Sequence, residues 1–349
     1  MTPPTLRIAL IIVCTWLFYY VILRFFVIFN CKSKLIPLII AVVLACMCIW
    51  AFLYQWEHKV LDIIATFAWW LFVLTFILFL ILVIEHIIWI WYKVNPRVFI
   101  WIIITVLWLW TYFSLCTKII NLDIQSDKIE NNVKILLVSD IHAENVTQDY
   151  HIKKIIKTIE LEKPDFVIIA WDLMNKPNSS YVNYFSTFKS VKNIPIFAVM
   201  WNHDVMGNTE IIKEIPDISG IRFLNNEKFI IDWVQLVWAI DKSLWWQEFL
   251  IDKIWLNEDS DLFTIFVTHQ PISLEKLKNY PIDLEVAWHT HRGQFYGMRK
   301  VAQLSNDYLY GEYKLWDKVA FVTQWIWTWG LPFRLWTQSE IVIINLINK

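Results

Sequence analysis

The chain has 349 residues, of which 57% are hydrophobic, and its formal net charge at pH 7 is -1. This length allows one large or two medium-sized domains, and the hydrophobic fraction is too high for an ordinary soluble protein. The near-neutral charge provides no general attraction for polyanions, so we expect no nucleic-acid partner.

The apolar residues are concentrated before about residue 120, whereas the remainder has the polarity of a globular domain. Four stretches are each long enough to cross about 30 Å of hydrocarbon as a helix. They are Leu6–Phe29, Leu35–Trp56, Ile63–Ile84 and Val98–Ile120. We therefore predict a bundle of about four transmembrane helices over residues 1–121 and an α/β domain over residues 122–349. A buried soluble helix bundle is the alternative, but it would not need stretches so long and so poor in charge.

The basic residues of the short loops predict the orientation in the membrane. Lys32 and Lys34 lie in the first loop, and Lys93 and Arg97 lie in the third, so both loops are assigned to the cytoplasm. Four spans then place the N-terminus and the C-terminal domain on the other side. We predict a multi-pass integral membrane protein with an extracytoplasmic C-terminal domain.

The second part of the chain has the pattern of an α/β domain. Residues 121–133 are polar and indicate a linker or a first edge strand, and His151–Leu161 has helical spacing. Short apolar runs typical of strands are Val133–Val138, Phe166–Ala170, Ile194–Met200, Phe229–Ala239, Leu262–Thr268, Leu284–Ala287, Ala320–Thr323 and Glu340–Ile347. Strands that alternate with helices in the first half favour an α/β arrangement.

Five short motifs with metal-binding side chains follow these apolar runs. They are Ser139-Asp140-Ile141-His142, Asp172-Leu173-Met174, Asn202-His203-Asp204, Thr268-His269-Gln270-Pro271 and His289-Thr290-His291-Arg292-Gly293-Gln294. Open α/β sheets place their sites at the carboxyl ends of strands. Carboxylates and imidazoles suit Mn, Fe or Zn, and two such ions about 3.5–4 Å apart can clamp a phosphoryl group. One such residue alone is usually a cap or a satisfied polar group, so the prediction depends on the ordered set.

The order and spacing of the five motifs resemble the calcineurin-like metallophosphoesterase family, which shows D-x-H, G-D, G-N-H-D, a single H and G-H-x-H. The resemblance covers about residues 133–346, and the preceding apolar stretches are similar to bacterial membrane-associated members with N-terminal transmembrane helices. It implies two β-sheets packed face to face and flanked by helices, a four-layer α-β-β-α sandwich, with a binuclear metal centre at one edge.

The resemblance also implies a role for each matching residue. Asp140, His142 and His291 would hold one divalent ion, Asn202, His269 and His289 would hold the second, and Asp172 would bridge them. His203 would stabilise or protonate the leaving oxygen, and Asp204 would orient His203. The implied reaction is phosphoester hydrolysis by in-line attack of a metal-bound hydroxide, without a covalent intermediate.

Tryptophan occupies the positions where the family pattern has glycine. Trp171, Trp201 and Trp288 precede Asp172, Asn202 and His289, and an indole at these positions should clash with the site, because only glycine allows the sharp turn and close approach. Trp238, Trp316, Trp325, Trp327 and Trp336 also stand where glycine is favoured. The chain has 6 Gly and 23 Trp, whereas average usage would give about 24 Gly.

Two interpretations account for these tryptophans. In the first, the gene comes from a lineage that reads UGA as glycine, and UGA has been translated as tryptophan. In the second, the protein is a degenerate, inactive homologue. We favour recoding, because decay would also have damaged the metal ligands, and every predicted ligand is present.

The sequence leaves the substrate open among phosphodiesters, phosphomonoesters and lipid-linked pyrophosphates. A membrane anchor would concentrate a lipid-linked substrate, and Arg292 is either a guanidinium that meets a substrate phosphate or a surface residue. The main alternative function is a non-catalytic, membrane-anchored binding or scaffold module. A transporter is a weaker alternative, because Glu85 and His86 lie near the end of a predicted span. No obligate protein partner is evident.

Overall fold

The computed structural model describes residues 4–28, 35–53, 59–91, 96–141, 143, 149–170, 173–174, 179–199, 210–224, 228–238, 261–288, 290, 302–304, 306–324, 326, 334 and 337–349. The chain divides into two compact units, Met1–Leu109 and Trp110–Lys349.

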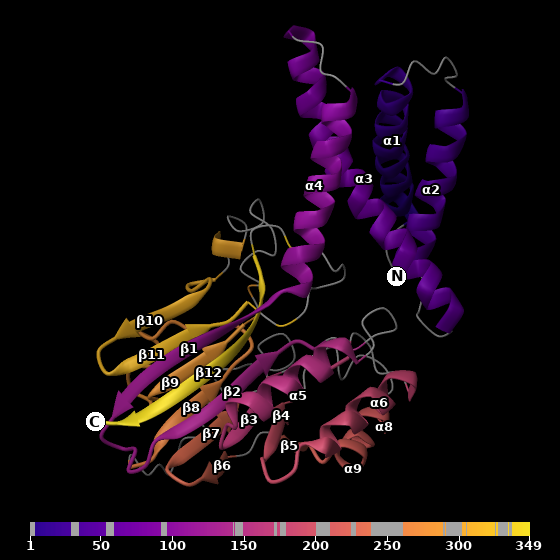
Figure 1. Ribbon diagram of the computed structural model, residues 1–349. Coiled ribbons are helices and arrows are strands. Elements are labelled where there is room, and N and C mark those ends of the chain that lie inside the picture. The colour runs from indigo at the N-terminus through magenta and orange to yellow at the C-terminus, as the bar shows by residue number, and fades with distance from the viewer. Residues whose placement is uncertain are drawn as a thin grey trace. The chain divides into compact units, whose positions relative to one another are not determined.

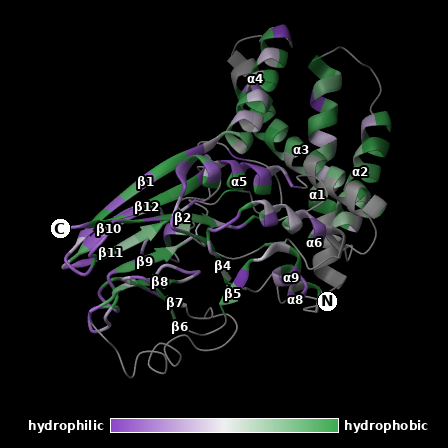
Figure 2. Ribbon diagram, turned by 60° about the horizontal axis from the view of Figure 1, so that its bottom comes forward, coloured by the Kyte–Doolittle hydropathy of each residue, from purple (hydrophilic) through white to green (hydrophobic). Residues whose placement is uncertain are grey.

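Four helices account for the first unit and its junction with the second. They are α1 (Pro4–Ile28), α2 (Leu35–Leu53), α3 (Lys59–Trp91) and α4 (Pro96–Leu115) (Figure 1). Their residues are mostly apolar (Figure 2). Phe18 of α1 packs with Ala41 and Ala45 of α2 and with Ala68 of α3. These alanines allow the helix backbones to approach closely.

One buried pair of charged residues lies inside the first unit. Arg24 Nη2 of α1 lies 3.0 Å from Glu85 Oε2 of α3, and both side chains are buried. Next to this pair, the Tyr20 hydroxyl lies 3.1 Å from His86 Nδ1. Buried charges are stable only when they are paired, and this pairing accounts for a glutamate within an otherwise apolar helix.

The four predicted membrane spans are not confirmed. Among the residues that the structure describes, no helix has both the length and the apolar character that crossing a membrane requires. The fourth predicted span also ends differently, because α4 stops at Leu115 and residues 117–120 belong to a strand. Of the two alternatives for the polar stretch at 121–133, a linker or an edge strand, the structure shows an edge strand, which begins at Thr117 and ends at Ser126.

The second unit contains two six-stranded sheets. In the first sheet the order is β1 (Thr117–Ser126), β12 (Ser339–Asn348), β2 (Val133–Ser139), β3 (Phe166–Ala170), β4 (Ile196–Val199) and β5 (Arg222–Leu224). In the second the order is β10 (Gly311–Leu315), β11 (Lys318–Val322), β9 (Leu284–Ala287), β8 (Phe263–Val267), β7 (Val234–Trp238) and β6 (Lys228–Ile231). Strands β2 to β5 are parallel, as are β11, β9, β8 and β7.

The sheets pack face to face around one apolar core. Leu137 and Ile168 of the first sheet belong to the same buried cluster as Ile265 and Val286 of the second. Alternate residues of the first sheet face outward, where α5 (Tyr150–Glu162), α6 (Ser179–Phe185), the 3-10 helix η1 (Ser186–Ser190) and α9 (Ile215–Ser219) cover them. Helix α5 confirms the predicted helix, and its buried isoleucines recur at helical spacing.

The fourth layer of the predicted sandwich is not seen among the residues of the second unit that the structure describes. Leu274, Leu277 and Tyr308 cover the outer face of the second sheet, and none of these three lies in a helix. A further helix, α8 (Glu210–Lys213), lies near α9 (Figure 1). The structure therefore shows two mixed sheets with helices on one outer face.

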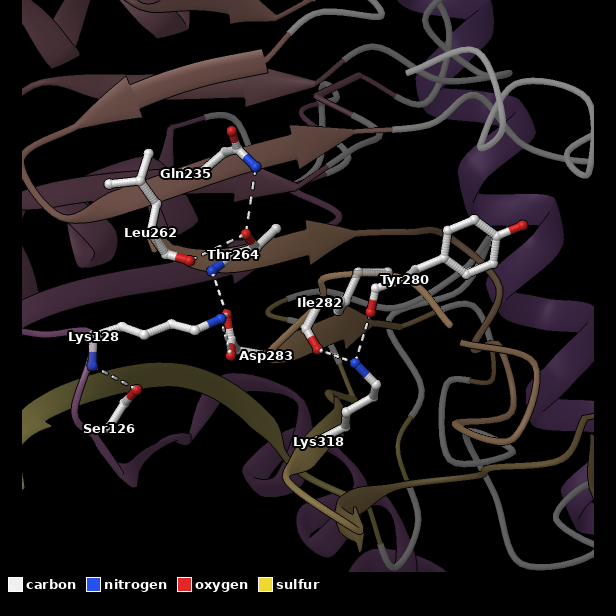
Figure 3. A network of polar contacts seen from close by, with 9 residues as sticks. All are labelled: Ser126, Lys128, Gln235, Leu262, Thr264, Tyr280, Ile282, Asp283 and Lys318. Carbon is white, nitrogen blue, oxygen red and sulfur yellow. Dashed lines mark hydrogen bonds and ion pairs between the residues drawn. The ribbon is translucent and has the colours of Figure 1, made fainter. Parts of the chain in front are cut away.

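A polar network joins the sheets at the amino ends of β8 and β9 (Figure 3). Asp283 accepts hydrogen bonds from Lys128 Nζ, at 2.8 and 2.9 Å, and from Thr264 N, at 2.8 Å. Lys128 follows β1 of the first sheet, whereas Asp283 precedes β9 of the second. Lys318 Nζ donates to the carbonyls of Tyr280 and Ile282. We call the contacts of Asp283 with Lys128 and Thr264 the distal clamp.

Candidate metal site

The strands place the beginnings of the five motifs at the carboxyl ends of parallel strands. In the first sheet, Ser139 pairs with Ala170, and Ala170 pairs with Val199, so three motifs start side by side. In the second sheet, Val267 pairs with Val286, which brings the fourth and fifth motifs together. This edge is where a parallel sheet presents its functional side chains.

Asp140 occupies the turn directly after β2. Its side chain is fully buried, and its backbone has a φ of 54°. Its N–H donates to Ala170 O at 3.2 Å, which ties the first motif to the second. Aspartate tolerates this left-handed conformation better than most residues, and strained backbone of this kind clusters at functional sites. The strain turns the chain out of the sheet at the predicted ligand.

His269 follows β8 and is buried, with 6% of its surface exposed. Its ring packs edge-on against the indole of Trp288, with 6.0 Å between the ring centroids and 84° between the planes. The backbone N–H of Trp288 donates to His269 O at 3.2 Å. The indole predicted to interfere with the site therefore lies directly against a predicted ligand.

Three described residues, Thr323, Gln324 and Ile326, connect the strand ends of the two sheets. Thr323 N donates to Ala287 O at 2.8 Å, and Ile326 N donates to Ser139 O at 3.2 Å. Ala287 lies two residues before His289, and Ser139 immediately precedes Asp140. We call Thr323, Gln324 and Ile326 the bridging segment, because these residues bond to both sheets at the edge that carries the motifs.

Two buried glutamates close to this edge, Glu285 and Glu340, are not predicted from the sequence. Glu285 of β9 accepts hydrogen bonds from Thr268 Oγ1, at 2.9 Å, and from Ile272 N, at 2.7 Å, and so holds both ends of the loop that contains His269. Burial raises the pKa of Glu285 to about 8, although both hydrogen bonds oppose the rise. Glu340, at the start of β12, accepts hydrogen bonds from the bridging segment.

Arg334 and His151 are two further buried residues that the motifs did not reveal. Burial, together with the charges of Lys154 and Arg334, lowers the pKa of His151 to about 3, so His151 is neutral at pH 7. Burial also lowers the pKa of Arg334 to about 10, against the charges of Glu340 and Asp140. In the sequence, Arg334 stands out as a charged residue between apolar neighbours, whereas His151 has polar and charged residues on both sides and gives no such signal.

Comparison with known proteins agrees with the motifs. Residues 133–293 match the sequence profile of the calcineurin-like phosphoesterase family. An uncharacterized metallophosphoesterase of Helicobacter pylori (strain J99 / ATCC 700824) is 28% identical over 238 residues, covering 66% of this chain and 64% of that protein. YkuE, an uncharacterized metallophosphoesterase of Bacillus subtilis (strain 168), is 26% identical over 61% of this chain and 78% of its own length.

Residues 133–293 form a calcineurin-like metallophosphoesterase domain. A Danio rerio protein named transmembrane protein with metallophosphoesterase domain is 24% identical to the chain, covering 66% of this chain and 57% of that protein. The match spans less than two thirds of the Helicobacter relative. The comparisons therefore establish the phosphoesterase domain and leave the activity of the whole protein to be inferred.

Eight of the ten predicted site residues of the phosphoesterase domain lie outside the described residues. They are His142, Asp172, Asn202, His203, Asp204, His289, His291 and Arg292. In the described ranges, no three His, Cys, Asp or Glu side chains are grouped closely enough to hold a metal ion. Thr290, between two predicted ligands, is described; it is buried and donates a hydrogen bond to Leu309 O. The roles of the ten residues, seven as metal ligands, two in catalysis and one in substrate binding, stay a prediction.

The two described ligand candidates fit a divalent cation by their chemistry. The Asp140 carboxylate and the His269 imidazole are both buried at the carboxyl ends of strands. A buried carboxylate is stable only with a compensating positive charge or hydrogen bonds, and an oxygen–nitrogen donor pair suits Mn, Fe or Zn. The residues present are thus compatible with the metals that this family uses.

Proposed function

We propose that the chain is a metal-dependent phosphoester hydrolase. The observation that carries the proposal is the position of Asp140 and His269, which are buried at the same edge of a domain whose sequence matches the calcineurin-like phosphoesterase family. Each stands in the motif where the family pattern has a ligand of its type. The other predicted ligands follow strands that end at this edge.

The side chains of the site have separate tasks in this proposal. Two divalent ions, when bound, would supply an activated water and neutralise charge on the phosphoryl oxygens. Asp140, His142 and His291 would hold the first ion, with Asn202, His269 and His289 around the second and Asp172 between them. His203, oriented by Asp204, would donate a proton to the leaving oxygen. Arg292 would contact a substrate phosphate.

We also infer that the functional protein has glycine at the eight positions of Trp171, Trp201, Trp238, Trp288, Trp316, Trp325, Trp327 and Trp336. Trp316 supports this inference. It is the first residue of a two-residue turn, because Leu315 pairs with Lys318, and its φ is 56°. A two-residue hairpin turn with a positive φ at this position favours glycine, whereas a bulky side chain there is an outlier. The Trp316 side chain is 55% exposed and has no core position that would justify the strain.

Mass spectrometry of the protein purified from its own host tests the recoding inference. Peptides that contain residues 288 and 316 should be lighter than the printed sequence requires, by the mass difference between tryptophan and glycine. Peptides that contain none of the 23 tryptophans are the internal control and should match. Tryptophan at 171, 201 and 288 in the native protein would sink the inference.

The hydrolase proposal is tested on the full chain with glycine at the eight positions, which we call the glycine-restored chain. We expect it to bind two Mn²⁺ ions and to hydrolyse an aryl phosphodiester such as bis(p-nitrophenyl) phosphate. Asp140→Asn and His269→Ala should each lower kcat/KM by at least about 100-fold, because each removes a ligand of the metal centre. Glu312→Gln, on exposed β10, is the control and should retain activity.

Two finer points belong to the same proposal. We propose anchoring in a membrane by the apolar N-terminal unit, with the phosphoesterase domain on the extracytoplasmic side. Two vertebrate relatives are named transmembrane proteins, and the basic residues of the first and third loops support the orientation. An anchored domain would meet lipid-linked phosphoesters at high local concentration, so we propose them as the substrate class.

One observation favours the alternative of a non-catalytic scaffold. Trp288 is fully buried against His269, so a chain that truly contains this indole has less room for a metal. The glycine-restored chain separates the two functions. Absence of both metal binding and turnover from it would favour the scaffold.

A further inference from the structure

The bridging segment is the structural basis of a further inference. Its first residue, Thr323, bonds to the second sheet at Ala287, and its last, Ile326, bonds to the first sheet at Ser139. The predicted ligands Asp140 and His289 follow these two contact points closely in the chain. The bridging segment thus bonds to each sheet within two residues of a predicted ligand.

A carboxylate of the first sheet holds this segment. Glu340 Oε1 accepts hydrogen bonds from Thr323 Oγ1, at 2.6 Å, and from Gln324 N, at 2.9 Å. Glu340 Oε2 accepts from Gln324 Nε2, at 2.9 Å, and from the Tyr310 hydroxyl, at 3.0 Å. Glu340 is 1% exposed, and these four donors offset the cost of burying its charge.

Glu340 stands close to the first motif. It lies at the start of β12, which runs antiparallel to β2 with Val342 opposite Leu137. The first residues of β12 therefore lie beside the carboxyl end of β2, where Asp140 follows. The contact between Glu340 and the bridging segment thus links the first sheet to the chain that leaves β11 of the second.

A buried arginine holds the same segment through its backbone. Arg334 Nη2 donates to Gln324 O at 2.8 Å, and Nη1 donates to Gln338 O at 2.9 Å. Arg334 is 2% exposed. The charges of Glu340 and Asp140 act on its guanidinium, which therefore lies within electrostatic reach of a predicted metal ligand. A planar guanidinium that spans two carbonyls is a rigid support that a lysine would not replace.

We propose that Glu340 and Arg334 are positioning residues that fix the bridging segment between the sheets and thereby set the spacing of the two ligand groups of the metal centre. This proposal rests on the proposed function, because it assumes that Asp140 and His289 bind metal. A binuclear centre needs its ions about 3.5–4 Å apart. Since its predicted ligands come from two sheets, these sheets must be held at a fixed spacing at this edge. Neither residue contacts substrate in this proposal.

The experiment compares Glu340→Gln with a matched variant at the other end of the sandwich. Asp283→Asn alters the distal clamp, and in both variants an amide nitrogen replaces a carboxylate oxygen that faces hydrogen-bond donors. Both changes are made in the full-length glycine-restored chain, and each should lower the thermal unfolding midpoint. Titration with Mn²⁺ alone should show that Glu340→Gln binds at least ~10-fold more weakly, as is typical when a group behind the ligands is lost. Asp283→Asn should bind within twofold of the parent.

Hydrogen exchange provides a second measurement that needs no metal. In the metal-free full-length proteins, the amides of Thr323 and Ile326 should exchange at least ~10-fold faster in Glu340→Gln, because their segment loses its support. Asp283→Asn should leave the exchange of these two amides unchanged. Arg334→Lys should resemble Glu340→Gln in both measurements, since a lysine cannot span the two carbonyls.

The outcomes separate the two proposals. A parent that binds no Mn²⁺ overturns the proposed function, and exchange at Thr323 and Ile326 still tests whether Glu340 holds the segment. A parent that binds Mn²⁺, together with a Glu340→Gln variant that binds it equally well, overturns the positioning proposal alone. Unchanged exchange at both amides in Glu340→Gln also overturns it. Equal losses of metal affinity in Glu340→Gln and Asp283→Asn would show a general effect of lower stability and would contradict it as well.

Discussion

Asp140 and Trp316 both adopt a positive φ, at 54° and 56°, but the two residues differ in what the sequence can explain. Aspartate populates this conformation several-fold more often than most residues, and its position after β2 fits a strained turn beside a functional site. Tryptophan has no such preference, and its turn has no part in the predicted site. The positive φ therefore supports the predicted ligand role at Asp140, whereas at Trp316 it supports the inferred glycine.

Residue type alone could identify the predicted ligands but not the residues that hold them. Asp140 and His269 stand out because a carboxylate or an imidazole follows an apolar strand. Glu285 and Glu340 lie within apolar strands, where period-two alternation makes a polar residue indistinguishable from an exposed one. Only the packing of the second sheet and of the bridging segment shows that both are buried.

The stability of the fold should depend on the protonation of Glu285. Burial is the main cause that raises its pKa from 4.5 to about 8, so the folded state holds this proton more tightly than the unfolded state. The contribution to stability is therefore fully present below about pH 4.5 and is lost as the pH rises to about 8. Each pKa unit corresponds to about 1.4 kcal/mol, which makes the expected loss a few kcal/mol.

Glu285→Gln keeps a neutral side chain at every pH and should remove this part of the pH dependence. Urea denaturation of the variant and the parent at pH 5.5 and pH 8 measures the effect. The parent should lose more unfolding free energy than Glu285→Gln between pH 5.5 and pH 8. This difference in loss should be larger than the difference in unfolding free energy between the two proteins at pH 5.5. The exposed variant Glu312→Gln should keep the parental pH dependence, and an identical slope in Glu285→Gln would contradict the assigned pKa.

At the scale of elements, the helices and strands with a clear local apolar period could be predicted from the sequence. Strands that pair with residues far away in the chain could not be predicted in full. Helix α5 and strands β2 and β3 were predicted almost to the residue, because their apolar spacing is local. Strand β1 was assigned to a membrane span at its start, because it continues the preceding apolar run. Its partner β12 lies at the far end of the chain, with Thr117 paired to Ser339. One predicted strand, Phe229–Ala239, is the hairpin β6–β7.

The distal clamp yields a prediction for how the two sheets are joined. Lys128 and Asp283 have side-chain exposures of 30% and 15%, so their ion pair should contribute about 0.2–1 kcal/mol. Asp283 also accepts the hydrogen bond of the buried Thr264 N–H. Asp283→Ala should therefore cost more than Lys128→Met, on the order of 1–3 kcal/mol. Unfolding free energies of the single and double variants measure both terms, and equal costs would show that the ion pair alone matters.

At the scale of the whole molecule, sequence reasoning predicted one site from five separated motifs, and the strands bring the starts of those motifs to one edge of the sandwich. The contacts that connect the two sheets could not be predicted. The bridging segment bonds to residues that precede it by 36 positions at Ala287 and by 187 at Ser139 (323 − 287 and 326 − 139). No local pattern encodes such distances, since these bonds depend on how the sheets pack.

The first unit carries a prediction about where the protein resides. All four helices expose apolar side chains, among them Trp16 at 58%, Ile39 at 54%, Phe67 at 62% and Trp101 at 67%. Exposed apolar surface on this scale is unfavourable in water and marks a surface that lies against lipid or another apolar partner. We expect the full-length chain to sediment with membranes and to remain there after washes with high salt and alkaline carbonate.

Detergent should release the protein from these membranes, because detergent replaces lipid around the apolar helices. A peripheral membrane protein of the same cells is the control and should be removed by the carbonate wash. Protease added outside intact cells should cleave the phosphoesterase domain if the predicted orientation is right, and should spare it if the domain is cytoplasmic. Recovery of the full-length chain in the supernatant before any detergent would contradict the anchor itself, since exposed residues such as Trp101 would then face water.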